Sequence, residues 1–298
     1  MMTKEELSEL VNKGMTVEDI SKELKLPMGV VRFYLIKYKL SVKDNVSKAI
    51  KKSKVSPTHS LCEVDRINMV KNSKYYDEFI ALVDGLMLSD GWIEDKSVTS
   101  EYCRLAIEQR EDRLEFLELV MSILDKVRIY SCISRKRKAR KVKIANRYVN
   151  QNSTIILRSE RHPIFNELRK RWYDTSVKPA KKIVPKDVNL SPLSLSVWYQ
   201  GDGYLMNLTS GKDYTHPAIG LSTQSFTYDE CKFLARKLSE LYDFDVKVYE
   251  MKYKSTGKKR PVIYITGHVS VGRFLRITKP WMCKCFEYKW DLEGIMRR

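Results

Sequence analysis

The chain has 298 residues, which is enough for two or three domains that each bury a core of their own. Hydrophobic residues make up 43% of it, which excludes extensive disorder, and no apolar run approaches the ~20 residues that a membrane-spanning helix needs. Lysine and arginine number 55 against 37 acidic residues, and the resulting formal charge of +18 favours a polyanionic partner, most often nucleic acid.

The N-terminus and the cysteines bear on the cellular compartment. The first ten residues, MMTKEELSEL, contain no apolar signal core and carry acids early, which argues against export and against a cleaved organelle presequence. The six cysteines show no paired metal-ligand spacing, so reduced thiols are expected. We therefore expect an intracellular protein of the cytoplasm or nucleoid, consistent with a phage or bacterial host, that is not secreted and binds no membrane.

Residues 1–40 predict three short helices. Capping boxes at Thr3 and Thr16 open the first two, and the third helix is basic as well as apolar. Two helices, a tight turn and a basic helix form the helix-turn-helix pattern, whose last helix can enter a DNA major groove. Arg32 and Lys37 are the candidate DNA contacts of that helix. A small three-helix docking bundle is the alternative.

A basic linker is expected between this module and the rest of the chain. Residues 41–73 are polar and lack periodic apolar positions. Their lysines either follow a phosphate backbone or belong to a solvated tether.

The remaining chain repeats one pattern of helices and strands. The first half, 74–185, predicts a helix to Asp90, strands near 92–109, a helix over 111–125, strands near 127–135 and 141–158, and a helix near 163–173. The second half, 186–298, predicts a helix to Gly201, strands near 203–209 and 217–224, a helix from Thr227, two more strands, and a helix over 269–279. Each half therefore has the order αββαββα, an α+β fold whose antiparallel sheet is covered on one face.

Both halves carry an apolar helix that ends in an aspartate beside glycine, Asp90 in GLMLSDG and Asp202 in SVWYQGDG. Small residues spaced four apart would let the two helices pack closely, with Gly85 and Ser89 in one and Val197 and Gly201 in the other. Two carboxylates at the negative ends of helix dipoles are unfavourable unless a cation lies between them. Such oxygen ligands suit Mg²⁺ or Mn²⁺ and the hydrolysis of phosphodiesters. Two ordinary Asp-Gly turns are the alternative.

These motifs resemble the signature of the LAGLIDADG homing endonucleases. Four blocks in the family's order, LSPLSLSVWYQGDGYL, IGLSTQSFTYDECKFLARKL, RPVIYITG and TKPWMCKCFEYKW, are similar to the single-chain, omega-type intron endonucleases. The resemblance covers about residues 75–298. It implies a monomer with two pseudo-symmetric halves, whose saddle-shaped sheets contact the major groove of a long asymmetric double-stranded DNA site. It also implies cleavage of both strands across the minor groove, which leaves 3′ overhangs.

The resemblance assigns roles to individual residues. Asp90 and Asp202 match the metal-binding acids of the family. Lys182 in KPAKKIVP and Lys289 in CFEYKW match its basic residues, which would lie near the scissile phosphates and stabilise negative charge or order the attacking water.

Two glutamines match the family's water-organising position near the end of the second strand. Gln224 alternates with Ile219 and Leu221 and is expected to point away from the packed face. Gln109 is its counterpart by spacing. It is two residues from Ile107 and so lies on the same face of the strand, and it reaches the DNA face only through a bulge or a frayed strand end.

Asp84 occupies a position where the family usually has a small apolar residue. The sequence does not identify the residue that pairs with it.

Basic and aromatic residues supply the remaining DNA contacts. The segment SRKRKARKVK, 134–143, is predicted to be a hairpin tip that binds DNA phosphates, with a solvated loop as the alternative. Base readout is expected from the outward strand residues Arg104, Lys247 and Tyr249. The phosphate contacts expected at the hairpin tip are Arg135, Lys136, Arg137, Lys138, Arg140 and Lys141.

The predicted function is that of a site-specific, Mg²⁺-dependent homing endonuclease acting on double-stranded DNA. The family also includes intron RNA-splicing maturases, so intron RNA is an alternative partner. A regulator of the same fold that has lost catalysis is the third possibility, but both acids persist here with lysines in matching places. No intein splice residues bracket the chain, which favours a free-standing or intron-encoded protein.

Overall fold

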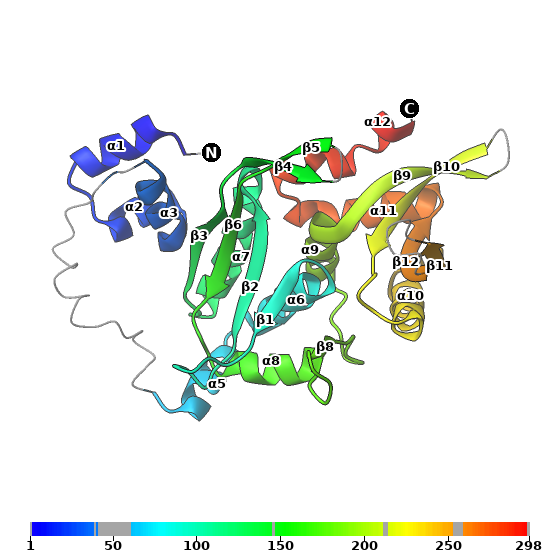
Figure 1. The fold of residues 1–298 in the computed structure, drawn as a ribbon, viewed down its shortest axis with the longest axis horizontal. Coiled ribbons are helices and arrows are strands. Elements are labelled where there is room, and N and C mark those ends of the chain that lie inside the picture. The colour runs from blue at the N-terminus through cyan, green and yellow to red at the C-terminus, as the bar shows by residue number, and fades with distance from the viewer. Residues whose placement is uncertain are drawn as a thin grey trace. The chain divides into compact units, whose positions relative to one another are not determined.

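Figure 1 shows the computed structural model, which describes residues 2–38, 40, 61–144, 147–210, 214–252 and 259–296. Only the backbone is described at residues 135, 140–144, 147–149, 209, 210, 214, 215 and 296. The chain divides into two compact units, Met1–Phe79 with Ile93–Glu167, and Ile80–Trp92 with Leu168–Arg298. The helix that begins at Tyr76 runs from the first unit into the second.

The N-terminal module has the three helices that the sequence predicts. The capping boxes at Thr3 and Thr16 are both formed, each with a side-chain oxygen accepting from a backbone N–H three residues on. The helices are α1 (Lys4–Asn12), α2 (Val17–Glu23) and α3 (Met28–Tyr38).

The expected linker needs correction over its C-terminal part. Residues 41–60 lie outside the described residues, but Glu63–Lys71 form helix α5. Its buried residues are Val70 and Arg66, and the Arg66 guanidinium donates to the carbonyl of Arg161 at 3.3 Å. An arginine in a buried position breaks the apolar periodicity by which a helix is recognised in sequence.

The first unit contains a four-stranded sheet in the order β1-β2-β6-β3, in which β2 and β3 both pair antiparallel with β6. The segment expected as one strand near 141–158 forms three: the hairpin β4–β5 and the central strand β6. The elements are β1 (Gly91–Glu94), β2 (Arg104–Arg110), η2 (Glu111–Arg113), α7 (Leu114–Lys126), β3 (Ser131–Arg137), β4 (Arg140–Ile144), β5 (Arg147–Gln151), β6 (Thr154–Ser159) and α8 (Ile164–Trp172).

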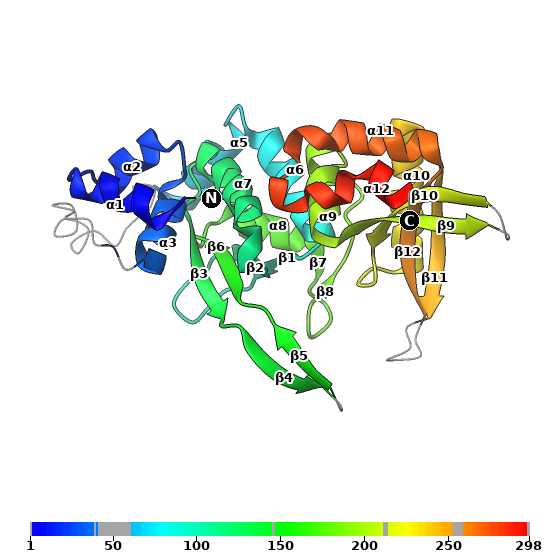
Figure 2. The same cartoon turned by 90° about the horizontal axis from the view of Figure 1, so that it is seen from above.

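The second unit contains a sheet of the same topology, β9-β10-β12-β11, with antiparallel pairing throughout. Helices α10 and α11 pack against its strands (Figure 2). The elements are β7 (Tyr173–Asp174), β8 (Lys181–Lys182), α9 (Pro192–Asp202), β9 (Gly203–Ser210), β10 (Tyr214–Ser222), α10 (Tyr228–Tyr242), β11 (Val246–Lys252), β12 (Lys259–Thr266), α11 (His268–Thr278), η3 (Lys279–Trp281), η4 (Lys284–Trp290) and α12 (Leu292–Met296).

The common strand order, first-second-fourth-third, confirms the α+β fold with two antiparallel sheets and internal repetition. The repeat also explains the similar spacing of motifs in the two halves, because each helix-strand-strand unit is built twice. Within the described part of the chain, none of the helices has the length and apolar character needed to cross a lipid bilayer.

Candidate functional site

The two motif helices meet along the seam of small residues that the sequence predicts. Helix α6 (Tyr76–Leu88) leads to Asp90, and α9 ends at Asp202. A Cβ added to Gly85 would lie 2.6 Å from the carbonyl oxygen of Ser194, and one added to Gly201 would lie 2.7 Å from the Cβ of Ser89. The helix backbones therefore approach more closely than any side chain would permit.

The seam brings the two aspartates into electrostatic contact. The Cβ position of Gly201 lies 3.7 Å from Oδ2 of Asp90, and Gly201 directly precedes Asp202. Burial raises the pKa of Asp202 to about 6, and the negative charge of Asp90 adds to the increase, while Lys182 and Lys289 oppose it. Both carboxylates belong to the second compact unit, so one unit holds the complete pair.

Lys182 secures the end of the first motif helix. It lies in the short strand β8, and its Nζ donates to the carbonyls of Met87 at 3.0 Å and Gly91 at 2.8 Å, on either side of Asp90. Burial lowers the pKa of the Lys182 ammonium to about 8, although the charges of Asp202 and Asp90 counteract part of this decrease. The ammonium therefore satisfies carbonyls that a helix end leaves without partners.

Lys289 makes the equivalent contacts at the end of the second motif helix. It lies in the 3-10 helix η4, is 8% exposed, and donates to the carbonyls of Tyr199 at 3.0 Å and Gln200 at 2.8 Å. The hydroxyl of Tyr199 donates in return to the Lys289 carbonyl at 2.5 Å. The two lysines named by the sequence thus have matching positions, and each binds the C-terminal carbonyls of the helix in its own half.

The two glutamine candidates have different surroundings. The β2–β6 register runs without a shift from Ala106↔Arg158 to Arg110↔Thr154, so Gln109 stays on the face of Ile107. Of its two possible routes to the DNA face, a bulge is absent from this described ladder, and a frayed strand end stays a prediction. Gln109 also belongs to the first unit, whereas both aspartates belong to the second. Gln224 follows the last residue of β10 by two positions and is half-buried in a turn, where its carbonyl accepts from Arg260 at 3.3 Å.

The candidate DNA-contacting side chains differ in exposure and in partners. Arg104 pairs with Glu94 at 2.6 Å, and Lys247 lies 3.5 Å from Asp245 with half of its side chain exposed. Tyr249 is 46% exposed. In the basic hairpin, Lys136 and Lys138 are exposed and Arg137 lies 3.8 Å from Glu108, while the side chains of Arg135, Arg140 and Lys141 lie outside the described ones.

Helix α3 packs against the first half of the repeat, within the first unit. A Cβ at Gly29 would lie 2.2 Å from Cε of Met121 in α7 and 2.9 Å from the Ser131 carbonyl in β3. Lys37 lies 3.5 Å from Glu111. Part of the helix surface is therefore used for docking, and Arg32 is exposed. The five buried residues of the helix are Val30, Val31, Phe33, Tyr34 and Leu35.

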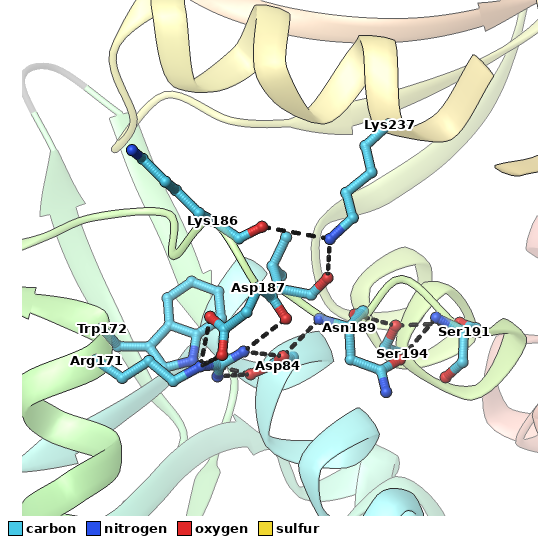
Figure 3. Close-up of polar contacts among 10 residues, drawn as sticks. Asp84, Arg171, Trp172, Lys186, Asp187, Asn189, Ser191, Ser194 and Lys237 are labelled. Carbon is cyan, nitrogen blue, oxygen red and sulfur yellow. Dashed lines mark hydrogen bonds and ion pairs between the residues drawn. The ribbon is translucent and has the colours of Figure 1, made fainter. Parts of the chain in front are cut away.

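A buried polar network beside the seam was not predicted from the sequence. Asp84 in α6 is fully buried and accepts hydrogen bonds from Arg171, from Trp172 Nε1 at 2.9 Å, and from the backbone N–H of Asn189 at 2.7 Å (Figure 3). Asn189 in turn accepts from the N–H of Ser191, the residue before α9. The network therefore ties α6, the end of α8 and the start of α9 together.

The donor set at the seam fits a hard divalent cation. Two carboxylates that raise each other's energy are stabilised when a cation lies between them. Among the described residues, no cluster of three or more His, Cys, Asp or Glu side chains is grouped for metal binding. A pair of acids is enough for Mg²⁺, because Mg²⁺ keeps several water ligands and binds substrate phosphate oxygens instead of requiring a full set of protein ligands.

Comparisons with known proteins agree with this arrangement. A family model described as the LAGLIDADG DNA endonuclease family matches residues 80–271. The uncharacterized protein MJ1098 of Methanocaldococcus jannaschii is 31% identical over 192 residues, which are 62% of this chain and 66% of that protein. The cytochrome b mRNA maturase bI2 of Debaryomyces hansenii is 28% identical over 127 residues, 42% of each protein. The chain thus spans less than two thirds of the length of both relatives.

The fold of a solved structure matches most of the chain. The homing endonuclease I-WcaI bound to its DNA recognition sequence has a TM-score of 0.54 and 18% sequence identity. The match covers 84% of this chain and 94% of that chain. At this level of identity the likeness establishes a common fold.

Proposed function

The chain belongs to the LAGLIDADG DNA endonuclease family, and on this premise we propose that it is a site-specific homing endonuclease. It makes metal-dependent double-strand breaks in a long asymmetric DNA target and leaves 3′ overhangs. The observation that carries the proposal is the close approach of Gly201 to Ser89 and Asp90, which brings two acids to the same end of a helix seam. The formal charge of +18 supports DNA as the substrate.

The chain's own groups have distinct roles in the proposed reaction. Asp90 and Asp202 supply the oxygens that hold Mg²⁺ or Mn²⁺ against the DNA. When bound, such a cation would supply Lewis-acid polarisation of the phosphodiester and a more acidic water. Lys182 and Lys289 fix the ends of the motif helices, and their positive charges favour the anionic phosphate beside the acids. Gln224 remains a proposed water-organising residue, and Gln109 has weaker support because it shares the face of Ile107.

The domains divide this work between them. The two LAGLIDADG halves form a monomeric core that contacts the target, and the N-terminal module contributes contacts beyond it. Because five of the eleven residues of α3 are buried and Arg32 is exposed, we propose that Arg32 makes the module's principal contact. Arg32→Ala is then expected to weaken binding severalfold and to leave the cleavage rate of bound DNA unchanged. Binding that is unaffected by the substitution would restrict the module to a structural role.

Cleavage of a randomised duplex library tests the proposed function. The protein is incubated with the library and Mg²⁺, and the new ends are sequenced, which also identifies the overhang. We expect one asymmetric site with 3′ overhangs, and no cutting in EDTA. Asp90→Asn and Asp202→Asn should abolish cutting while specific binding survives, whereas Asp77→Asn, an exposed acid at the other end of α6, should cut normally.

A maturase is the second candidate, because a cytochrome b mRNA maturase is 28% identical over 127 residues. One chain can serve both functions, so the two are tested separately. Specific binding of a structured intron RNA by a protein that cuts no duplex in the library would replace the nuclease proposal. The retention of Asp90 and Asp202 argues against a regulator without catalysis.

A further inference from the structure

The second sheet has an apolar, aromatic face opposite its buried one. In β10 and β12, Ile219 and Ile263 point toward the helices and are fully buried. The alternate residues belong to the other face, because side chains of paired strands alternate together. We call this surface the tyrosine face. It comprises Tyr204, Met206, Leu208, Ala218, Gly220, Tyr249, Met251, Val262 and Tyr264.

The tyrosine face is held rigid by its own contacts. The ring of Tyr204 lies over Gly220, where an added Cβ would be 2.3 Å from Cζ of the tyrosine. The hydroxyls of Tyr204 and Tyr264 form a hydrogen bond of 2.9 Å, and the ring of Tyr249 meets Tyr264 edge-on at 5.6 Å. Gly220 is therefore a requirement of the face, because only glycine leaves room for the Tyr204 ring.

The corresponding face of the first sheet is charged. Glu94 accepts from Arg104 at 2.6 Å and from Arg158 at 2.9 Å. Glu108 accepts from the hydroxyl of Thr154 at 2.6 Å. The two sheets share a topology, but this face of the first carries ion-paired polar groups, whereas that of the second is mainly aromatic and aliphatic.

Two observations point to duplex DNA as the occupant of the tyrosine face. The face begins at Tyr204, two residues after Asp202, so DNA held at that acid runs onto it. Basic side chains border it. Lys247 is half exposed on the same face and lies 3.5 Å from Asp245, and Lys259 and Arg260 are exposed at the start of β12, where Lys259 lies 3.7 Å from Glu250. Apolar surface surrounded by basic side chains suits the major groove, whose floor carries the thymine methyl groups and whose walls are phosphate.

We infer that the tyrosine face selects thymine in its half of the target by apolar contact with C5 methyl groups. The first sheet reads its own half through polar and charged groups. This inference rests on the proposed endonuclease function and adds to it the base composition of one half-site. The side chains available for contact are Tyr249, at 46% exposed, Met251, at 45% exposed, and the half-buried Met206 and Leu208.

Deoxyuridine substitution tests the inference, because deoxyuridine lacks only the methyl group. The site found in the library is synthesised with deoxyuridine for thymidine in one half or in the other. Binding is measured by fluorescence anisotropy with the full-length Asp202→Asn protein, which does not cut. Each methyl in contact should contribute about threefold to fourfold in affinity, from the usual value for one buried carbon. We expect the loss in one half only.

Protein variants identify the surface that makes the contact. A Tyr249→Ser, Met251→Ser variant should bind the thymidine duplex more weakly, and its affinity should no longer depend on deoxyuridine substitution. If the two side chains and the methyl groups did not touch, the two changes would weaken binding independently. Gly220→Ala should act in the same half by displacing Tyr204. Tyr228→Phe, at an exposed tyrosine of α10, is the matched control.

The outcomes separate the inference from the proposed function. A specific site whose affinity ignores deoxyuridine in both halves, or ignores it equally in the wild type and the variant, overturns the inference alone. Failure to bind or cut any specific duplex overturns both. Tighter binding of a structured RNA than of the selected duplex assigns the tyrosine face to RNA instead.

Discussion

Asp84 and Arg171 form a buried bidentate ion pair, with Nη1 2.5 Å from Oδ1 and Nη2 2.8 Å from Oδ2. Asp84 is fully buried, and Arg171 also holds Asp187 at 2.9 Å (Figure 3). The carboxylate fixes α6 to the segment that leads into α9, and so sets how the two motif helices align. The alignment of the aspartates at the far ends of these helices depends on it.

Arg171→Met should destabilise the protein by about 3–5 kcal/mol, because it leaves the Asp84 carboxylate buried without its cation. The midpoint of urea unfolding, followed by circular dichroism, measures the change. Lys170→Met, at the exposed neighbouring position, should stay within about 0.5 kcal/mol of the wild type. The double variant Asp84→Leu, Arg171→Met should recover part of the loss, since no buried charge is left unpaired. A loss equal to that of Lys170→Met would mean that the pair contributes little.

Gly201→Ala should destabilise the second unit by about 1–3 kcal/mol, because the new Cβ would lie 2.7 Å from Ser89 and push the helices apart. Gly272→Ala is the matched control. An added Cβ there meets nothing within 4 Å, so helix propensity should stabilise α11 by up to about 1 kcal/mol. Opposite shifts of the thermal midpoints are expected. Equal shifts would contradict tight packing at the seam.

The seam could be predicted because the sequence encodes it locally. Gly85 and Ser89 are spaced four residues apart, and glycine at Gly201 indicates close approach without any knowledge of the partner helix. Lys182 and Lys289 could be located by the motifs around them. Their contacts with helix carbonyls could not, because these join residues 89 to 95 positions apart.

The remaining features depend on tertiary contacts that leave no local pattern. Asp84 binds Arg171 and Asn189, which are 87 and 105 residues away in the sequence. Its partner therefore could not be identified from the sequence. Gln109 lies on the face of Ile107, as the alternation along its strand predicts, and its water-organising role stays a prediction. The basic character of α3 suggested a free recognition helix, but the docking surface for Gly29 is created by segments a hundred residues away.

Lys182→Met should slow cleavage of bound DNA by roughly a hundredfold, because it removes a positive charge held beside Asp90 and Asp202, where negative charge develops. Affinity for DNA should change little, because Lys182 is directed to the carbonyls of Met87 and Gly91. Single-turnover cleavage with saturating protein separates the two effects. Lys181→Met, its exposed neighbour, should weaken binding slightly and leave the rate intact. The reverse pattern would place Lys182 among the phosphate-binding side chains.

His162 should make folding stability sensitive to acid. Its side chain is 2% exposed and its Nδ1 accepts from the N–H of Ile164 at 3.2 Å. Burial, and then the positive charge of Arg66, lower the pKa of His162 to about 3.

An unfolded histidine titrates near 6.5, so between about pH 6.5 and 3 the unfolded chain holds a proton that the folded chain lacks. Stability from this group is complete above pH 6.5 and is lost as the pH falls, by about 2 kcal/mol between pH 7 and pH 5. Urea unfolding of the wild type and of His162→Asn over this range measures the difference in slope. His268→Asn, at an exposed histidine, should retain the slope of the wild type. Parallel curves for the wild type and His162→Asn would show that another group causes the acid sensitivity.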